Sequence, residues 1–322
     1  MKRQNQDELL HDHNHDGVDR RGFLKCMAWA GTGALCLMNG GVLRSASLSG
    51  ISESAARAKG ELSFVQISDS HMGFHKPANQ DVIGTLKAAV DKINALPNPP
   101  EFLLHTGDIS HLSKPEEFDA VEQILKSCVA KDVFYVPGEH DVINDDNATN
   151  YMQRFGKGAL ARGWRTFEKK DVRFFGLVNV MNLNAGGLGS LGAEQLEWLE
   201  KETNGLSAST PIVVFAHIPL WNVYPEWGWG TEDGAQALGY LKRFGSVTVL
   251  NGHIHQTMQK VEGQVTFHTA ASTAFPQPQP GQAEGPGPMK VPADQLKQLL
   301  GITDVNFVRG QQALAIVDSK LA

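Results

Sequence analysis

The sequence predicts a mixed α/β fold in which two mixed β-sheets pack together with helices outside them. The first observation is an alternation that starts near Glu61. Short apolar segments with β-branched residues alternate with segments whose apolar residues recur at helical spacing. The second observation is that hairpin patterns replace this alternation further along the chain. The composition, 41% hydrophobic and 20% charged over 322 residues, is ordinary for a globular protein and allows a sizeable core.

The helices are predicted from the spacing of apolar residues and from the residues at their ends. Residues 81–96 have apolar positions at helical spacing and stop before Pro97. Residues 114–130 carry Pro115 near the start, where proline is tolerated. Further helices are expected at residues 193–203 and 234–244.

The predicted strands are short and apolar, and several of them end in polar residues. Residues 166–182 are interpreted as a hairpin with a turn at Lys170-Asp171. Residues 276–292 are rich in Pro, Gly and Gln, which predicts an irregular surface loop. The other strands are expected at residues 62–67, 102–105, 133–136, 211–216, 247–250, 265–269 and 313–317.

The first 58 residues differ from the rest of the chain. The pair Arg20-Arg21 precedes Gly-Phe-Leu-Lys, and a weakly polar run at residues 26–38 follows. This run is too short to span a bilayer, which needs roughly 20 apolar residues. The segment resembles a bacterial twin-arginine translocation signal, with cleavage expected after Ala58 or nearer Ala46. The alternative is an amphipathic N-terminal helix with a chance arginine pair.

The chain is therefore expected to consist of a leader, residues 1–58, and a single domain, residues 59–322. The twin-arginine machinery would export the folded domain to the periplasm. Loss of the leader removes Cys26 and Cys36 and leaves Cys128, so no internal disulfide is expected. A net charge of −6 predicts no nucleic-acid-binding surface, and no transmembrane span is expected. With this balance, binding a phosphate would require a local positive charge such as bound metal ions.

Carboxylates and imidazoles follow five of the predicted strands directly. Carboxylate and imidazole groups gathered at one edge of a sheet are the ingredients of a metal site. A single buried histidine is usually a hydrogen-bonded core residue. Five clusters in succession, each at a strand end, instead indicate one shared site. These residues are Asp69, His71, Asp108, Glu139, His140, Asp141, His217, His253 and His255.

The clusters form ordered motifs, which are Asp69-Ser70-His71, Gly107-Asp108, Gly138-Glu139-His140-Asp141, His217 and Gly252-His253-Ile254-His255. They resemble the motifs D-x-H, G-D, G-N-H-D/E, H and G-H-x-H of the calcineurin-like metallophosphoesterase family. The resemblance covers roughly residues 61–268. It implies a double β-sandwich flanked by helices and a hydrolase that acts on a small phosphorylated substrate.

The resemblance also implies a role for each motif residue at a site with two metal ions, expected to be Fe, Mn or Zn. Such a pair acidifies a shared water and holds the phosphoryl oxygens. The implied ligands are Asp69, His71 and His255 for the first metal, His217, His253 and Glu139 for the second, and Asp108 as the bridge.

Two further motif residues are implied to take part in catalysis. His140 would touch the substrate or the leaving-group oxygen, which suits an imidazole with an ordinary pKa of about 6.5. Asp141 would orient His140 by accepting a hydrogen bond from its other ring nitrogen.

The sequence departs from the family pattern at Glu139, where the family usually has Asn. A carboxylate makes the metal pair less positive, which would weaken its hold on a phosphate dianion. The second position would then favour iron(III), unless Glu139 turns away and water replaces it. His111 stands where the purple acid phosphatases of this superfamily have a metal-binding Tyr, so no purple charge-transfer band is expected. His111 would either touch substrate or only pack.

Aromatic residues are dense after His217, and they include Trp221, Tyr224, Trp227 and Trp229. They would either stack on a substrate base, with Trp221 and Trp227 as the candidate contacts, or pack the loop onto the body. The expected activity is hydrolysis of a phosphomonoester or phosphodiester. The alternatives are pyrophosphate cleavage of a nucleotide conjugate, and a metal- or ligand-binding protein of the same fold with little turnover.

Overall fold

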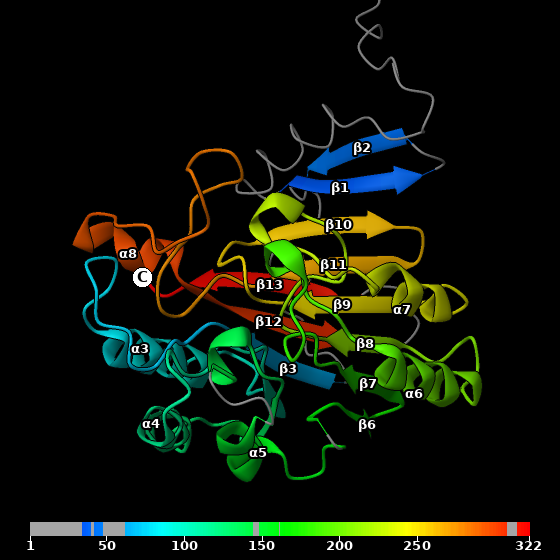
Figure 1. The fold of residues 1–322 in the computed structure, drawn as a ribbon, viewed down its shortest axis with the longest axis horizontal. Helices are drawn as coiled ribbons and strands as arrows, with labels where there is room; N and C mark the ends of the chain where they lie inside the picture. The colour runs from blue at the N-terminus through cyan, green and yellow to red at the C-terminus, as the bar shows by residue number, and fades with distance from the viewer. Residues whose placement is uncertain (1–33, 40–41, 48–61, 144–147, 161, 308–313) are drawn as a thin grey trace, which may run out of the picture.

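Two β-sheets packed face to face form the centre of the structure (Figure 1). The computed structural model describes residues 34–39, 42–47, 62–143, 148–160, 162–307 and 314–322. Within these ranges, the strands of the larger sheet are, in spatial order, β2 (Val42–Ser47), β1 (Ala34–Asn39), β10 (Met258–Glu262), β11 (Val265–Thr269), β9 (Val247–Asn251), β8 (Ile212–Phe215), β7 (Val172–Gly176) and β6 (Arg165–Lys169). The strands of the smaller sheet are β13 (Ala315–Lys320), β12 (Gly301–Phe307), β3 (Leu62–Ile67), β4 (Phe102–His105) and β5 (Asp132–Tyr135).

The strand directions place the ends of several strands together. In the smaller sheet β3, β4 and β5 are parallel, and in the larger sheet β7, β8 and β9 are parallel. Residues that follow these strands therefore emerge at the carboxyl edges of the two sheets, where α/β proteins commonly place their sites. Antiparallel hairpins extend both sheets, as β6–β7 does around Lys170 and Asp171, whose φ angles are 48° and 65°. Positive φ at both turn residues is typical of a tight two-residue hairpin.

Helices cover the outer faces of the two sheets (Figure 1). α3 (Val82–Asn94), α4 (Pro115–Leu125) and α5 (Thr149–Phe155) pack with the smaller sheet, whereas α6 (Ala193–Asn204) and α7 (Gly234–Leu241) pack on the larger one. Asp81 caps the start of α3, and its side chain accepts a 2.8 Å hydrogen bond from the amide of Gly84. α8 (Ala293–Leu299) leads into β12, and the short turns of 3₁₀ helix are η2 (Glu139–Asp141), η3 (Ala185–Gly187) and η4 (Pro225–Trp227).

The layer between the sheets is aromatic and aliphatic. The ring of Phe64 on β3 stacks on Phe102 at a centroid distance of 4.9 Å and meets Phe174 of the opposite sheet edge-on at 5.4 Å. Burial of this apolar surface is the main force that holds the two sheets together. The buried residues of this layer are Leu62, Phe64, Phe102, Leu104, Val136, Val172, Phe174, Val213, Phe215, Leu250, Val305 and Phe307.

This architecture confirms the predicted fold class of two packed mixed sheets flanked by helices. Every predicted strand and helix has a counterpart, although the helix expected at residues 114–130 ends earlier, at Leu125. The structure adds α5, α8, β10 and β12, which the sequence did not predict. None of the helices within the described ranges is long and apolar enough to cross a membrane.

The N-terminal segment also differs in part from expectation. β1 and β2 lie within the residues assigned to the leader, and they extend the larger sheet beyond β10, with Leu37 opposite Val261. The Arg20-Arg21 pair and most of the expected apolar run lie outside the described residues.

Candidate metal centre

The predicted metal ligands from both sheets meet at one cleft with a volume of about 290 Å³. Each of these residues lies in the loop that follows β3, β4, β5, β8 or β9. His71, Asp108, Glu139 and His253 line the cleft, and the other predicted ligands lie buried beneath it. The side chains form two groups, and the carboxylate of Asp108 lies between them.

The first group consists of Asp69, His71, Asp108 and His255, whose ligand atoms all lie within 4.8 Å of one another. Nε2 of His71 is 3.1 Å from Nε2 of His255 and 3.4 Å from Oδ2 of Asp108. Nε2 of His255 is 3.4 Å from Oδ1 of Asp69. All four side chains are buried. Buried carboxylates that converge on imidazole nitrogens fit a cation of the kind that prefers mixed N and O ligands.

The second group consists of Glu139, His217 and His253. The two carboxylate oxygens of Glu139 lie 2.9 Å from Nε2 of His217 and 2.9 Å from Nδ1 of His253. Oδ2 of Asp108 is 3.5 Å from Nε2 of His217, so this oxygen faces a histidine of each group. The position of Asp108 is the one expected of a bridging ligand. Glu139 faces the group and does not turn away from it.

The backbone at the ligands is held in an unusual conformation. Asp69, His71, Asp108, His253 and His255 have φ angles of 54°, 39°, 51°, 70° and 54°. Residues other than glycine rarely adopt positive φ, and clusters of such residues are typical of functional sites.

Gly252 allows the loop after β9 to approach the loop after β3. A Cβ atom on Gly252 would collide with Oγ of Ser68 and lie 2.7 Å from Oδ2 of Asp69. The amide of the next residue, His253, donates to both oxygens of Asp69, at 3.1 and 3.2 Å. The glycine of this motif is therefore needed for the close contact that places Asp69 beside His253.

Main-chain carbonyls orient two of the imidazoles. Nδ1 of His217 donates to the carbonyl of Thr106 at 2.7 Å, and Nδ1 of His255 donates to the carbonyl of Phe275 at 2.6 Å. Each bond leaves Nε2 directed at the carboxylates, which is the orientation of a metal-binding histidine. Nε2 of His217 and Oε2 of Glu139 are buried and lie 2.9 Å apart, but neither makes a hydrogen bond of good geometry. These orphaned atoms fit a metal ion, which would satisfy both.

The charge states of Glu139 and His217 in the second group are also consistent with a site for a cation. Burial raises the pKa of Glu139, but the His253 and His217 imidazoles outweigh it and hold that pKa well below its usual range. Burial opposes the charge of His217, yet Asp108 and Glu139 hold its pKa well above the usual range. Because a histidine ligand must be neutral, binding of a metal here would release this proton.

The structure places His140 at the cleft but contradicts the expected role of Asp141. Nδ1 of His140 donates to the main-chain carbonyl of His111 at 2.8 Å and not to Asp141. The buried carboxylate of Asp141 instead accepts hydrogen bonds from the amides of Ile109, Ser110 and Gly138, at 3.1, 2.8 and 2.9 Å. Asp141 therefore fastens the loop after β4 to the loop after β5. The prediction that it orients the imidazole was wrong because a main-chain carbonyl already occupies that position.

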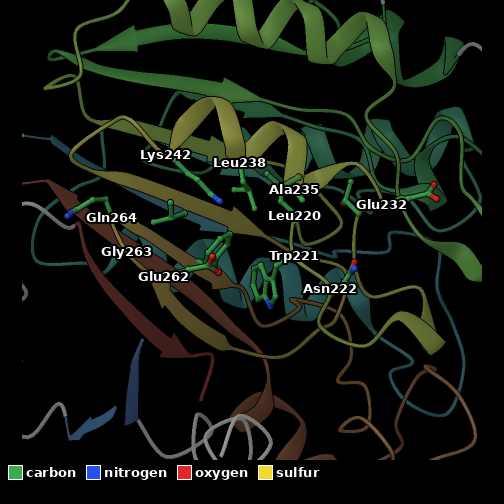
Figure 2. Close-up of a pocket in the computed structure, with 13 residues that line it drawn as sticks. Leu220, Trp221, Asn222, Glu232, Ala235, Leu238, Lys242, Glu262, Gly263 and Gln264 are labelled. Atoms are coloured by element: carbon green, nitrogen blue, oxygen red, sulfur yellow. The ribbon is translucent and has the colours of Figure 1, made fainter. Parts of the chain in front are cut away.

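The structure separates the two tryptophans that were predicted to bind substrate. Trp227 lines the metal cleft, together with the fully buried Trp229. Trp221 instead packs on Phe267 at 4.8 Å and lines a separate cavity of about 530 Å³ beside α7, as Figure 2 shows. The prediction for Trp221 was wrong because the loop after β8 directs this side chain away from the metal cleft.

The remaining cleft wall includes His111 and residues that the sequence analysis did not single out. Lys76 follows the D-x-H motif, and Gln277 and residues 286–288 belong to the segment predicted as an irregular loop. Phe275 directly precedes this segment, and its carbonyl orients His255. Only the Pro- and Gly-rich composition marked the loop, and nothing in its composition predicts contact with the motif residues.

The profile of the Calcineurin-like phosphoesterase family matches residues 62–257, the part of the chain that carries both groups. The chain belongs to this family. The phosphoesterase is also similar to a 3′,5′-cyclic-nucleotide phosphodiesterase of Nostoc sp., at 26% identity over 66% of this chain and 79% of that protein. A glycerophosphodiester phosphodiesterase of Enterobacter lignolyticus is 25% identical over 66% of this chain and 77% of its own length.

Solved structures share the fold of the phosphoesterase. A dimetal phosphatase from Danio rerio superposes with a TM-score of 0.65 at 14% identity, over 82% of this chain and 98% of that one. A purple acid phosphatase from yellow lupin seeds gives a TM-score of 0.57 at 12% identity, over 82% of this chain and 52% of that one. The phosphoesterase is a phosphoric ester hydrolase with the residue groups of a dinuclear metal centre.

Proposed function

We propose that the phosphoesterase hydrolyses small phosphodiesters in preference to phosphomonoesters. The observation that carries the proposal is the position of Glu139, whose carboxylate faces His217 and His253 at 2.9 Å each. With Asp69 and Asp108 it places three carboxylates at the centre, so any metal pair is one charge less positive than it would be with Asn at this position. A phosphodiester has one negative charge, whereas a monoester, with a second pKa of about 6, is mostly a dianion at neutral pH. Both similar proteins from Nostoc and Enterobacter are named as phosphodiesterases, which supports the proposal.

The residues would divide the work of the reaction between them. When bound, the two metal ions supply positive charge for the phosphoryl oxygens and lower the pKa of the attacking water. His140 is held by its Nδ1 hydrogen bond, so its Nε2 is the atom free to donate a proton to the leaving oxygen. Among the described residues that line the cleft, Lys76 alone has a lysine or arginine charge, and it would meet a non-bridging oxygen of the substrate.

The test compares two aryl phosphates, bis(p-nitrophenyl) phosphate and p-nitrophenyl phosphate, on protein whose metal content has been measured. The wild type is expected to have the higher kcat/KM for the diester. Glu139→Gln keeps the side-chain size and removes the charge, so it should move the ratio of the two kcat/KM values towards the monoester by about tenfold, or 1.4 kcal/mol. Higher wild-type activity on the monoester, or an unchanged ratio in the variant, would contradict the proposal.

The same carboxylate guides the proposal for the metals. A third negative charge favours iron(III) at the second position, with Fe, Mn or Zn at the first. Elemental analysis of wild type against Glu139→Asn tests this, because the variant should lose iron selectively. Identical metal content in the two proteins would count against it.

His140 distinguishes an enzyme from a metal-binding protein of the same fold, because a binding protein has no need of a histidine poised over the cleft. His140→Ala should retain both metals and lose activity by 10²- to 10⁴-fold, the usual contribution of a general acid. Wild-type protein that binds metals but hydrolyses no aryl phosphate would favour the binding protein.

We also infer that residues 1–58 direct export through the twin-arginine machinery. The support is the Arg20-Arg21 pair before a short apolar run. Replacement of both arginines by lysine should leave the activity in the cytoplasm, whereas wild-type activity should be recovered from the periplasm. The same distribution for both proteins would refute export by this route.

A further inference from the structure

We propose that His111 is a positioning residue that holds the metal ligand His71 with its side chain and the imidazole of His140 with its main chain. The inference rests on the dinuclear centre described above. It assigns a function to a position at which the metal-binding Tyr of purple acid phosphatases is missing.

The side-chain contact follows from the position of the two rings. Nδ1 of His111 lies 3.4 Å from Nδ1 of His71. Nε2 of His71 faces Asp108 and His255, so it is the nitrogen that would bind a cation. A neutral imidazole that binds through Nε2 has its proton on Nδ1. That proton then points to His111, which must accept it.

The acceptor is unusual for a metal-binding histidine. Such a ligand usually donates its second N–H to a carboxylate, a carbonyl or a water, which fixes both the tautomer and the direction of the ring. His217 and His255 follow this rule through the carbonyls of Thr106 and Phe275. Of these three ligands, His71 is the one whose Nδ1 faces another imidazole.

The main-chain contact of His111 is with His140. The carbonyl of His111 accepts the hydrogen bond from Nδ1 of His140 at 2.8 Å. The rings of His111 and His140 also stack, with centroids 4.8 Å apart and planes 16° apart. One residue therefore sets the direction of a first-group ligand and of the imidazole expected to protonate the leaving group.

The position of His111 is itself fixed by its backbone. Its amide donates to the carbonyl of Met72 at 2.8 Å and to Oε2 of Glu117 at 3.2 Å. Glu117 is buried, and it also accepts from the amides of Leu112 and Lys114, at 2.8 and 3.4 Å. The rings of Phe74 and His111 pack edge to face, with centroids 5.2 Å apart. The residue is therefore held well enough to orient others.

The imidazoles of His71, His111 and His140 could alternatively form a separate metal site, because their ligand atoms lie close together. That site would need the Nδ1 lone pair of His71 while Nε2 of the same ring serves the first group. It would also need His140, whose Nδ1 is already bonded to a carbonyl. The hydrogen-bonded arrangement needs neither and uses each nitrogen once.

Two substitutions at position 111 distinguish the contribution of its hydrogen-bond acceptor from that of its aromatic ring. His111→Asn places Oδ1 where Nδ1 was and removes the stacking ring, whereas His111→Phe keeps the ring and removes the acceptor. The measurements are metal retention against a graded chelator, by elemental analysis, and kcat and KM for bis(p-nitrophenyl) phosphate. Circular dichroism and the unfolding temperature establish that both variants fold.

His111→Phe is expected to lose one metal at a chelator concentration 10- to 100-fold lower than wild type, the usual effect of losing an outer partner of a metal ligand. Its kcat should fall with KM little changed, and His111→Asn should retain metal within about threefold of wild type. Wild-type retention in His111→Phe, or equal losses in both variants, would overturn the proposal. A wild-type protein that binds no pair of metal ions would instead refute the dinuclear centre itself, and this outcome is distinct from both results on the variants.

Discussion

The amide of His140 donates a 3.0 Å hydrogen bond to Oδ1 of Asp108. Oδ2 of the same carboxylate faces His71 and His217. Asp108 therefore uses one oxygen to hold the loop that carries His140 and the other to face both metal groups. Movement of this carboxylate would disturb metal binding and the leaving-group acid together.

Asp108→Asn separates these two functions of the carboxylate. The amide oxygen can still accept the bond from His140, but the bridging negative charge is lost. We expect the affinity for metals to fall by roughly 100-fold or more, at the upper end of what is seen for partners of metal sites, with activity lost in parallel. Isothermal titration of metal-free protein with manganese gives the affinity. Retention of both metals at wild-type affinity would show that Asp108 does not bridge them.

Glu117 should matter for activity although it lies outside the metal groups. Glu117→Ala leaves the amides of Leu112 and Lys114 without their buried acceptor, which costs about 1–3 kcal/mol per unsatisfied group, and the amide of His111 keeps only Met72 as its acceptor. We expect a lower unfolding temperature and a reduced kcat, because the carbonyl that holds His140 loses its support. Glu117→Gln keeps an acceptor oxygen and is the matched control. A Gln variant as impaired as Ala would instead indicate a need for the negative charge.

Trp227 and Trp221 should respond differently to removal. Trp227→Ala is expected to raise KM for bis(p-nitrophenyl) phosphate by about three- to tenfold, because an aromatic contact is worth roughly 0.5–1.5 kcal/mol. Trp221→Ala should leave KM unchanged and reduce the free energy of unfolding by about 3–5 kcal/mol, the usual cost of removing a buried tryptophan. Kinetics and chemical denaturation of both variants check the pair. The assignment fails if Trp221→Ala raises KM as much as Trp227→Ala does.

His105 should make the protein less stable in acid. Burial, which outweighs the opposing charge of Asp69, lowers the pKa of His105 to about 3 from 6.5, and its Nε2 is paired with Oγ of Ser70 at 3.0 Å. Because the folded pKa lies below the unfolded one, the unfolded state binds the proton first. The proton uptake of His105 therefore costs no stability above pH 6.5. Towards pH 3 it lowers the free energy of unfolding by up to about 1.4 kcal/mol per pH unit.

His105→Gln is the variant that tests this pH dependence. Its amide can keep the bond to Ser70 but does not titrate. Denaturation of both proteins in chelator between pH 7 and pH 4 should give a shallower pH slope for the variant. Equal slopes would mean that other groups cause the acid sensitivity.

The sequence predicted those parts of the centre that depend on strand ends. Asp69, His71 and Asp108 follow parallel neighbouring strands, so their convergence was expected from the chain order alone. The partner of His140 could not be predicted in this way, because a main-chain carbonyl such as that of His111 leaves no trace in residue type. Trp221 and Trp227 lie on one loop, and only its path determines which of them reaches the metals. β12 was missed because Asp304 and Asn306 interrupt its apolar pattern, although the whole strand is buried.

The two metal groups draw their ligands from both sheets. The first joins the loops after β3 and β4 of the smaller sheet to the loop after β9 of the larger one. The second joins the loop after β5 to those after β8 and β9. Bound ions therefore link the halves of the sandwich at one edge, and by mass action a ligand at 1,000 times its Kd adds about 4 kcal/mol to the folded state. Metal supply would then control the lifetime of the folded protein as well as its turnover. Chelation would increase the unfolded fraction and so expose the chain to proteases.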